Sequence, residues 1–169
     1  VVIIHDRNVS RTTNGQGLVA KLTLNEIKQL DAGSWYSSDF SGERVPTLDE
    51  VFIEVGNKIL MNIELTNYTT PYDGLVDRVV EIVKKNNMEK RVFFSSFLAM
   101  NLKKARKRMP GCGIGFLVYP GPARLIQRWL QPPPRSIDSI HPHCGSVTTQ
   151  LVVHEHRLGL SLIHISEPT

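Results

Sequence analysis

The chain has 169 residues, of which 41% are hydrophobic and 21% are charged, and its formal net charge is +4. This is an ordinary globular composition, and the length suffices to bury one sizeable core. The sequence shows no internal repeat at a solenoid period, and no apolar run approaches the roughly 20 residues of a transmembrane helix.

Residues 1–17 begin with four β-branched residues and continue into a polar loop that contains glycine. An uninterrupted β-branched run predicts a strand buried on both faces, as in parallel sheets. His5 and Asp6 follow directly, so we expect them at the carboxyl end of that strand, where α/β folds place their chemistry. By position alone, such a histidine is more often a hydrogen-bonded structural residue than a catalyst.

Two Thr-x-x-Glu sequences follow, and each has the form of a capping box. Thr23 with Glu26 predicts a helix that ends near residue 30, and Thr47 with Glu50 predicts one that ends near residue 55. Later hydrophobic periodicities predict alternating strands and helices. The predicted strands are 59–65, 92–94, 113–118 and 137–140, and the predicted helices are 75–85, 98–109, 124–130 and 148–158.

Glu64 is a lone carboxylate in the apolar strand 59–65. An ionised carboxylate at the interior or mouth of a barrel is costly unless a cation or hydrogen bonds compensate it. Hard cations such as Mg2+ and Ca2+ take carboxylate oxygens. Glu64 is therefore either a metal ligand or a strand-end residue that reaches solvent, and the spacing alone favours neither.

Five of the six residues in 103–108 are Lys or Arg. Such a cluster suits a nucleic acid or an anionic membrane surface. However, Leu98, Leu102 and Met109 recur at helical spacing, which indicates that the basic residues form the solvated face of a helix. No aromatic residues interleave with them, so we expect no nucleic-acid partner.

Residues 5–17 resemble the H-D-x-x-x-x-R-T-T-x-G-x-G stretch of the glycerophosphodiester phosphodiesterase family. The matching residues are His5, Asp6, Arg11, Thr12, Thr13, Gly15 and Gly17. The likeness continues through 31–33 and 45–50 to MNIEL at 61–65, which resembles the family's N-I-E-L-K, and it spans roughly residues 1–160.

This resemblance implies an α/β fold of the (β/α)8 TIM-barrel type. Such a barrel usually needs about 250 residues. We therefore interpret residues 1–160 as an incomplete barrel domain. It lacks the last strand, and it lacks the N-terminal strands, which carry the family's H-R-G and E-x-D motifs. Residues 161–169 resemble a recurrent tail of truncated sequencing contigs and are expected to be foreign.

The resemblance also implies metal-dependent hydrolysis of glycerophosphodiesters to sn-glycerol 3-phosphate and an alcohol. His5 would be one of two histidines that act as general acid and base. Glu64 would be one of three carboxylates that hold a divalent cation, Mg2+ or Ca2+. The residues expected to bind substrate or to orient these groups are Asp6, Arg7, Asn62 and His141.

One position departs from the family pattern. The family commonly has Lys two residues after the strand glutamate, where it helps to hold the phosphate charge, and this chain has Thr66. The residues available to substitute for that lysine are Asn67, Tyr68 and Arg7.

A second interpretation is a non-catalytic domain that binds phosphodiesters, or a defunct barrel fragment. One carboxylate seldom holds Mg2+ or Ca2+, which need several oxygens. Loss of one member of a cooperating catalytic set forfeits nearly all of the acceleration. We therefore expect the 169 residues alone to be inactive.

Two segments with aromatic residues leave further alternatives. Trp35, Tyr36 and Phe40 lie in a loop and either line the site of the substrate's alcohol group or pack the loop down. Residues 124–130 form either an amphipathic helix at a lipid surface or, as we favour, a barrel helix between proline-rich ends.

Overall fold

The computed structural model describes residues 1–56, 58–130 and 132–165. They fall into two compact units, each made of two pieces of the chain. The first unit consists of Val1–Ile59 and Thr66–Asn86, and the second of Leu60–Leu65 and Asn87–Thr169. Among the described residues, the parallel sheet lies in the second unit, whereas the first unit is built of helices and loops.

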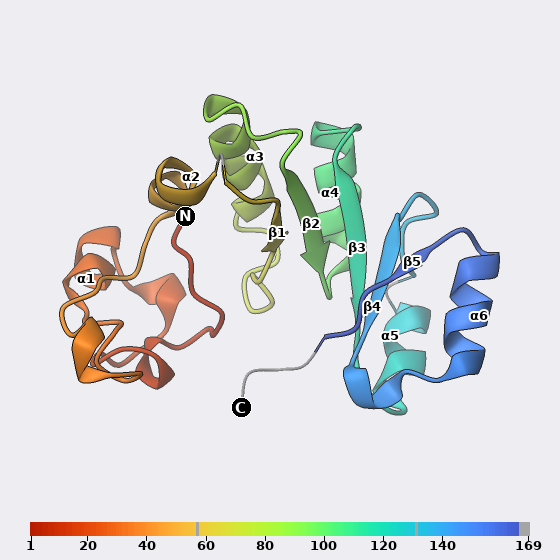
Figure 1. The fold of residues 1–169 in the computed structure, drawn as a ribbon, viewed down its shortest axis with the longest axis horizontal. Coiled ribbons are helices and arrows are strands. Elements are labelled where there is room, and N and C mark those ends of the chain that lie inside the picture. Colours follow the sequence, from red (N-terminus) through yellow and green to blue (C-terminus); the bar gives the residue numbers. More distant parts are fainter. Residues whose placement is uncertain (57, 131, 166–169) are drawn as a thin grey trace. The chain divides into compact units, whose positions relative to one another are not determined.

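A five-stranded parallel sheet forms the centre of the second unit (Figure 1). Its strands are hydrogen-bonded in their sequence order. Parallel neighbours require crossover connections, which helices supply after the second, third and fourth strands. The elements of this unit are β1 (Met61–Glu64), β2 (Val92–Ser96), α4 (Ala99–Arg108), β3 (Gly113–Val118), α5 (Ala123–Leu130), β4 (Ser139–Pro142), α6 (Thr149–Arg157) and β5 (Ser161–Leu162).

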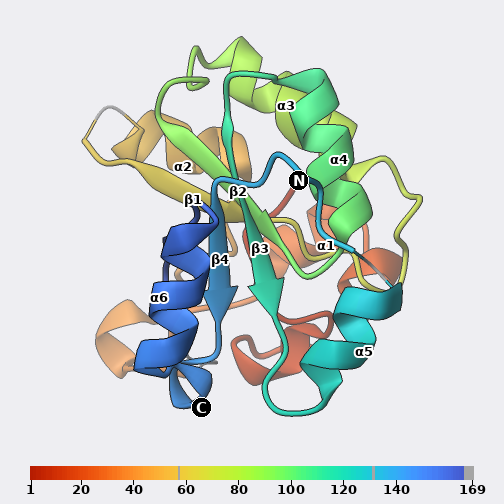
Figure 2. The same cartoon turned by 90° about the vertical axis from the view of Figure 1, so that its right-hand side faces the viewer.

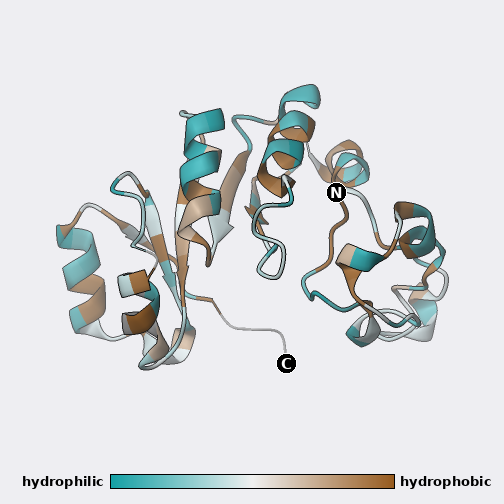
Figure 3. Cartoon of the chain, turned by 180° about the vertical axis from the view of Figure 1, so that it is seen from behind, coloured by the Kyte–Doolittle hydropathy of each residue, from teal (hydrophilic) through white to brown (hydrophobic). Residues whose placement is uncertain are grey.

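α4 turns an apolar face toward the sheet and packs against β2 and β3 (Figure 2). α6 packs against β5. Leu102 and Ala105 of α4 are buried, while Lys103 and Lys107 are exposed. Hydrophobic and hydrophilic residues accordingly lie on different sides of the helices in Figure 3. The expected solvated face of the basic helix is confirmed.

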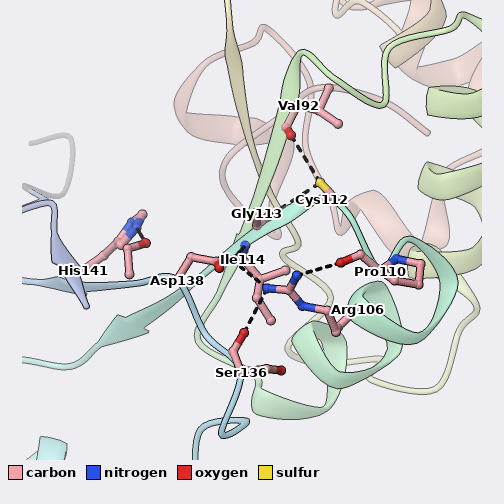
Figure 4. Close-up of polar contacts among 10 residues, drawn as sticks. Val92, Arg106, Pro110, Cys112, Gly113, Ile114, Ser136, Asp138 and His141 are labelled. Carbon is pink, nitrogen blue, oxygen red and sulfur yellow. Dashed lines mark hydrogen bonds and ion pairs between the residues drawn. The ribbon is translucent and has the colours of Figure 1, made fainter. Parts of the chain in front are cut away.

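Arg106 of that basic run ties α4 to the start of β4 (Figure 4). Its Nη1 donates to the carbonyl of Pro110 at 2.8 Å, and its Nη2 donates to Asp138 Oδ2 at 2.6 Å. The same carboxylate oxygen accepts from the backbone N–H of Ile114 at 2.7 Å. β4 therefore begins directly after Asp138, two residues later than the sequence predicts.

α5 buries a polar side chain and exposes apolar ones. Gln127 is buried, and its Nε2 donates to the carbonyls of Leu117 at 2.9 Å and Phe97 at 3.2 Å. Ile126 and Trp129 are 60% and 81% exposed. The predicted helix is confirmed, and a lipid contact of its exposed residues stays a prediction. No helix in the described part of the chain is long and apolar enough to cross a bilayer.

Glycines in β3 make room for large side chains from the two neighbouring strands. The rings of Phe93 in β2 and His141 in β4 stack, with their centroids 5.7 Å apart. A Cβ atom on Gly113 would lie 2.5 Å from Phe93 Cδ2. A Cβ atom on Gly115 would lie 2.7 Å from the Ser139 Oγ and would collide with the His141 ring. Close approach of neighbouring side chains therefore requires glycine at both positions.

The first unit contains both predicted capping boxes. Thr23 Oγ1 accepts a hydrogen bond from the Glu26 N–H at 3.3 Å, and Glu26 Oε2 accepts one from the Thr23 N–H at 2.7 Å. Thr47 and Glu50 exchange the same pair of bonds. The helices of this unit are α1 (Leu24–Gln29), α2 (Leu48–Val55) and α3 (Leu75–Lys85), with 3-10 helices at Val9–Arg11, Val19–Lys21 and Ser38–Phe40.

The strand expected at residues 1–4 is wrong. Val2 makes one isolated antiparallel bridge with Thr47, and the Ile3 N–H donates to the Pro46 carbonyl at 2.8 Å. Thr47 is also the N-cap of α2, so this neighbouring segment turns into a helix and offers no continuous ladder. β-Branched residues favour an extended backbone, but a strand also needs a partner.

Part of the segment interpreted as foreign belongs to the sheet. Ser161 and Leu162 form β5 and pair with Ser139 and Ile140 of β4. Residues 166–169 lie outside the described residues. The foreign origin of 161–169 stays a prediction.

We predict that Gly115→Ala lowers the free energy of unfolding by about 1–3 kcal/mol, because the added methyl group overpacks the space that His141 and Ser139 fill. Gly111→Ala is the matched control, since a Cβ there meets nothing within 4 Å. It should leave stability unchanged or raise it slightly. Urea unfolding of both variants measures the difference, and equal midpoints would refute the close packing over β3.

Candidate active site

The side chain of Asp6 joins His5 to Arg11. His5 Nδ1 lies 2.8 Å from Asp6 Oδ1, and Arg11 donates from Nε at 2.6 Å and from Nη2 at 3.0 Å. The hydrogen bonds from Arg11 and then His5 lower the pKa of Asp6 from 3.8 to about 2. At neutral pH the carboxylate only accepts hydrogen bonds, so the neutral His5 ring carries its proton on Nδ1 and its basic nitrogen is Nε2.

The loop around this trio is fixed by hydroxyl and glycine residues. Thr13 Oγ1 donates to the carbonyl of the fully buried Val9 at 2.8 Å and accepts from the Gly15 N–H at 3.0 Å. A Cβ atom on Gly15 would lie 2.6 Å from the side chain of Leu30. This tight turn brings Arg11 back to Asp6. The sequence analysis gave Arg11 no role, although an acidic and a basic residue five positions apart in a glycine-bearing loop signal such a pair.

His5, Asp6 and Arg7 line one open pocket of about 480 Å³ within the first unit. Its other lining residues are polar, namely Asn8, Thr66, Tyr68 and Thr69. A second pocket of about 220 Å³ shares Asp6, Arg7, Thr66 and Thr69 with the first, and its remaining walls are partly apolar, including Val1, Val2, Ile4, Leu18 and Val19. The first unit thus offers a polar pocket that adjoins a more apolar one.

The loop that carries Thr66, Tyr68 and Thr69 is organised by Asp73. Asn67 Nδ2 donates to Asp73 Oδ1 at 2.8 Å, and Thr70 Oγ1 donates to Asp73 Oδ2 at 2.7 Å. Asp73 Oδ1 also accepts from the Leu75 N–H at the start of α3. The loop is therefore shaped by its own polar side chains.

Glu64 is the last residue of β1 and lies opposite Ser95 of β2. It is therefore at the carboxyl end of the sheet, the edge at which parallel α/β folds place catalytic groups. Its side chain is half-buried. The role of Glu64 as a metal ligand stays a prediction.

Asn62 and His141 line a different pocket, of about 380 Å³, in the second unit. His141 is fully buried, and its Nε2 is hydrogen-bonded to Ser139 Oγ at 2.8 Å. Burial lowers the pKa of His141 to about 4, so the ring is neutral at neutral pH. These surroundings are those of a packed core histidine. Substrate contact by Asn62 or His141 stays a prediction.

The described residues do not complete a site for a divalent cation. Nowhere in residues 1–56, 58–130 and 132–165 do three His, Cys, Asp or Glu side chains gather. Glu64 brings one carboxylate, whereas Mg2+ and Ca2+ take about six to eight ligands, mostly oxygens. The cation that the sequence predicts therefore does not fit the described residues alone.

Comparisons with known proteins agree on one family. Residues 1–161 match the model of the glycerophosphoryl diester phosphodiesterase family. The chain is 39% identical over 163 residues to a glycerophosphodiester phosphodiesterase of Caldanaerobacter subterraneus subsp. tengcongensis, covering 96% of this chain and 66% of that protein. It is 34% identical over 112 residues to a glycerophosphodiester phosphodiesterase of Bacillus altitudinis, covering 65% and 46%.

Among solved structures, the chain resembles an Oleispira antarctica phosphodiesterase in complex with its product sn-glycerol-3-phosphate. The TM-score is 0.81 at 28% identity, over 99% of this chain and 68% of that one. This likeness and the sequential parallel sheet confirm the expected fold class, an α/β chain that forms part of a (β/α)8 barrel.

The fold and these comparisons thus place the chain among barrel proteins of the phosphodiesterase class. The chain belongs to the glycerophosphoryl diester phosphodiesterase family. It spans about two thirds of the length of the first curated relative and about half of the second.

We predict that Asp6→Asn lowers the free energy of unfolding at pH 6 by about 1 kcal/mol, after allowance for solvent screening. Because the folded-state pKa of Asp6 is depressed to about 2, its contribution is present above pH 4 and is lost as the pH falls toward 2. The difference between the variant and the parent chain should therefore shrink steadily from pH 4 to pH 2 and vanish only below pH 2. Urea unfolding across pH 2–6 measures this difference.

Asp39→Asn is the matched control for this prediction. Asp39 is exposed and has no ion pair within the described ranges. This control should follow the parent chain at every pH. A constant difference between Asp6→Asn and the parent from pH 6 to pH 2 would contradict the assignment.

Proposed function

We propose that the protein carrying this chain hydrolyses glycerophosphodiesters to sn-glycerol 3-phosphate and an alcohol. The observation that carries the proposal is the His5–Asp6 pair, held by Arg11, at an open polar pocket of a chain of this family. The names of the relatives support the reaction class, and the product in the Oleispira antarctica complex supports the substrate class.

In this proposal His5 is one proton carrier. Asp6 holds the proton of the neutral ring on Nδ1, so Nε2 can accept a proton from the attacking oxygen and return it to the leaving alkoxide. The attacking oxygen is that of water or of the 2-hydroxyl group of glycerol. Attack by water forms one P–O bond, breaks the P–O bond to the alcohol, and gives sn-glycerol 3-phosphate and the neutral alcohol directly. Attack by the 2-hydroxyl group expels the neutral alcohol and forms a cyclic phosphodiester, and water then breaks the P–O2 bond of that ring to give sn-glycerol 3-phosphate.

We further propose Glu64 as one ligand of a divalent cation, Mg2+ or Ca2+. Its place at the carboxyl end of β1 supports this assignment. The remaining ligands would come from outside the described residues, since those residues gather no second and third carboxylate at one place. The 169-residue chain alone should accordingly bind such a cation weakly.

A second candidate function is phosphodiester binding without hydrolysis. The incomplete cation site favours it for the 169 residues taken alone. The two candidates differ in turnover, which an assay of the full-length protein measures directly.

We predict chelator-sensitive release of sn-glycerol 3-phosphate from glycerophosphocholine by the full-length protein. His5→Ala should lower kcat by about 10²- to 10⁴-fold, because a proton carrier is lost. Glu64→Ala should abolish the dependence of the residual rate on added Mg2+ or Ca2+. The 169-residue chain should show no turnover.

Two variants outside the proposed site serve as controls. His154→Ala removes an exposed histidine of α6, and Glu54→Ala removes an exposed carboxylate of α2. Neither should change kcat. Should the full-length protein remain inert with metal present while it still binds sn-glycerol 3-phosphate, hydrolysis is refuted and binding without turnover takes its place.

A further inference from the structure

The pocket around His5 contains one cation that no carboxylate balances. Besides the phenol of Tyr68, its ionisable side chains are His5, Asp6 and Arg7. The negative charge of Asp6 is already met by Arg11 through two hydrogen bonds. Arg7 is exposed and has no ion pair within the described ranges of the chain. The pocket as a whole is therefore positive.

The rest of the lining is rich in hydrogen-bond donors. Thr66, Tyr68 and Thr69 bring hydroxyl groups, and Asn8 brings an amide nitrogen because its Oδ1 accepts from the Ser10 N–H. A guanidinium beside hydroxyl and amide donors, with the single carboxylate neutralised, suits an anion with several acceptor oxygens. The volume of about 480 Å³ accommodates a small molecule.

Both walls of this pocket are held by contacts that do not use Arg7's side chain. The Arg7 carbonyl accepts from the Val19 N–H at 2.9 Å, which fixes the backbone from which the guanidinium projects. The opposite wall is the loop that Asn67 and Asp73 organise. The Arg7 guanidinium thus makes none of the contacts that hold these two walls. In contrast, Arg11 donates hydrogen bonds from Nε and Nη2 to Asp6.

We propose that Arg7 is the cation that recognises the phosphate group of the ligand, with hydroxyl donors from Thr66 and Thr69. This rests on the proposed function, because it names how that site holds its substrate's phosphate. Arg7 then compensates for the threonine at position 66, where a lysine would otherwise supply the charge. The planar guanidinium offers two parallel donors to two phosphate oxygens, which an ammonium group cannot do.

The test measures binding of sn-glycerol 3-phosphate to the full-length protein by calorimetry, so it needs no turnover. Arg7→Gln should raise Kd about tenfold, and Arg7→Lys should raise it less because the charge remains. Arg78→Gln is the matched control, since Arg78 is an exposed arginine of α3 that lines neither pocket of this unit. It should leave Kd unchanged.

A second variant tests compensation directly. Thr66→Lys added to Arg7→Gln should restore most of the lost affinity, because it returns a cation to the same pocket. Inorganic phosphate and glycerophosphocholine as parallel probes distinguish a general phosphate site from one that requires the glycerol or the diester. The proposal predicts that Arg7→Gln weakens all three.

Unchanged Kd values in a folded Arg7→Gln protein would overturn the proposal, whether or not the protein hydrolyses its substrate. Weakened binding in a protein without turnover would refute the hydrolytic function and leave the Arg7 site standing. If Arg7→Gln fails to fold, the Kd values of the Arg7→Lys and Thr66→Lys proteins test the proposal instead. A Kd for Arg7→Lys equal to the parent value, with no tighter binding by Thr66→Lys, would count against the proposal.

Discussion

The Asp6 carboxylate is the group on which the arrangement of polar side chains around His5 depends. It accepts from both His5 and Arg11, and these bonds keep its pKa well below neutrality. One consequence is tautomeric, since the proton of the neutral His5 ring stays on Nδ1. The other is electrostatic, because the charge of Arg11 neutralises that of Asp6. Among the residues that line the pocket, Arg7 then supplies the positive charge. Removing one carboxylate would alter both properties together.

The second unit depends on a steric constraint. Gly113 and Gly115 have no side chains, and the stacked rings of Phe93 and His141 fill the space that Cβ atoms at these two positions would occupy. His141 is therefore buried and neutral, with a ring nitrogen spent on Ser139. A histidine in this environment contributes to packing, and the same strands carry Glu64 to the carboxyl end of the sheet. The register places Gly115 in line with Glu64 through Ser95, so the packing over β3 lies at the same level of the sheet as the Glu64 carboxylate.

Local signals in the sequence predicted most of the fold. The capping boxes at Thr23 and Thr47 depend only on residues three apart, so both were predictable. The strand expected at residues 1–4 failed because strand formation depends on a partner, and the Thr47 segment turns into α2. The start of β4 shifted because Asp138 is bound by Arg106, which lies 32 residues away. A contact between residues so far apart in the sequence produces no pattern in the sequence around either residue.

The candidate site was predictable only in part, for the same reason. The motif pointed to His5, and Asp6 and Arg11 pair within five residues of one loop. In contrast, Arg7 and the loop at 66–69 line one pocket through the tertiary fold, which no local pattern predicts. That loop has a further consequence. Asn67 and Thr70 hold the loop through Asp73, and neither of these printed hydrogen bonds uses the side chain of Thr66 or Thr69. The residues of this loop that line the polar pocket are therefore different from the residues whose side chains hold its shape.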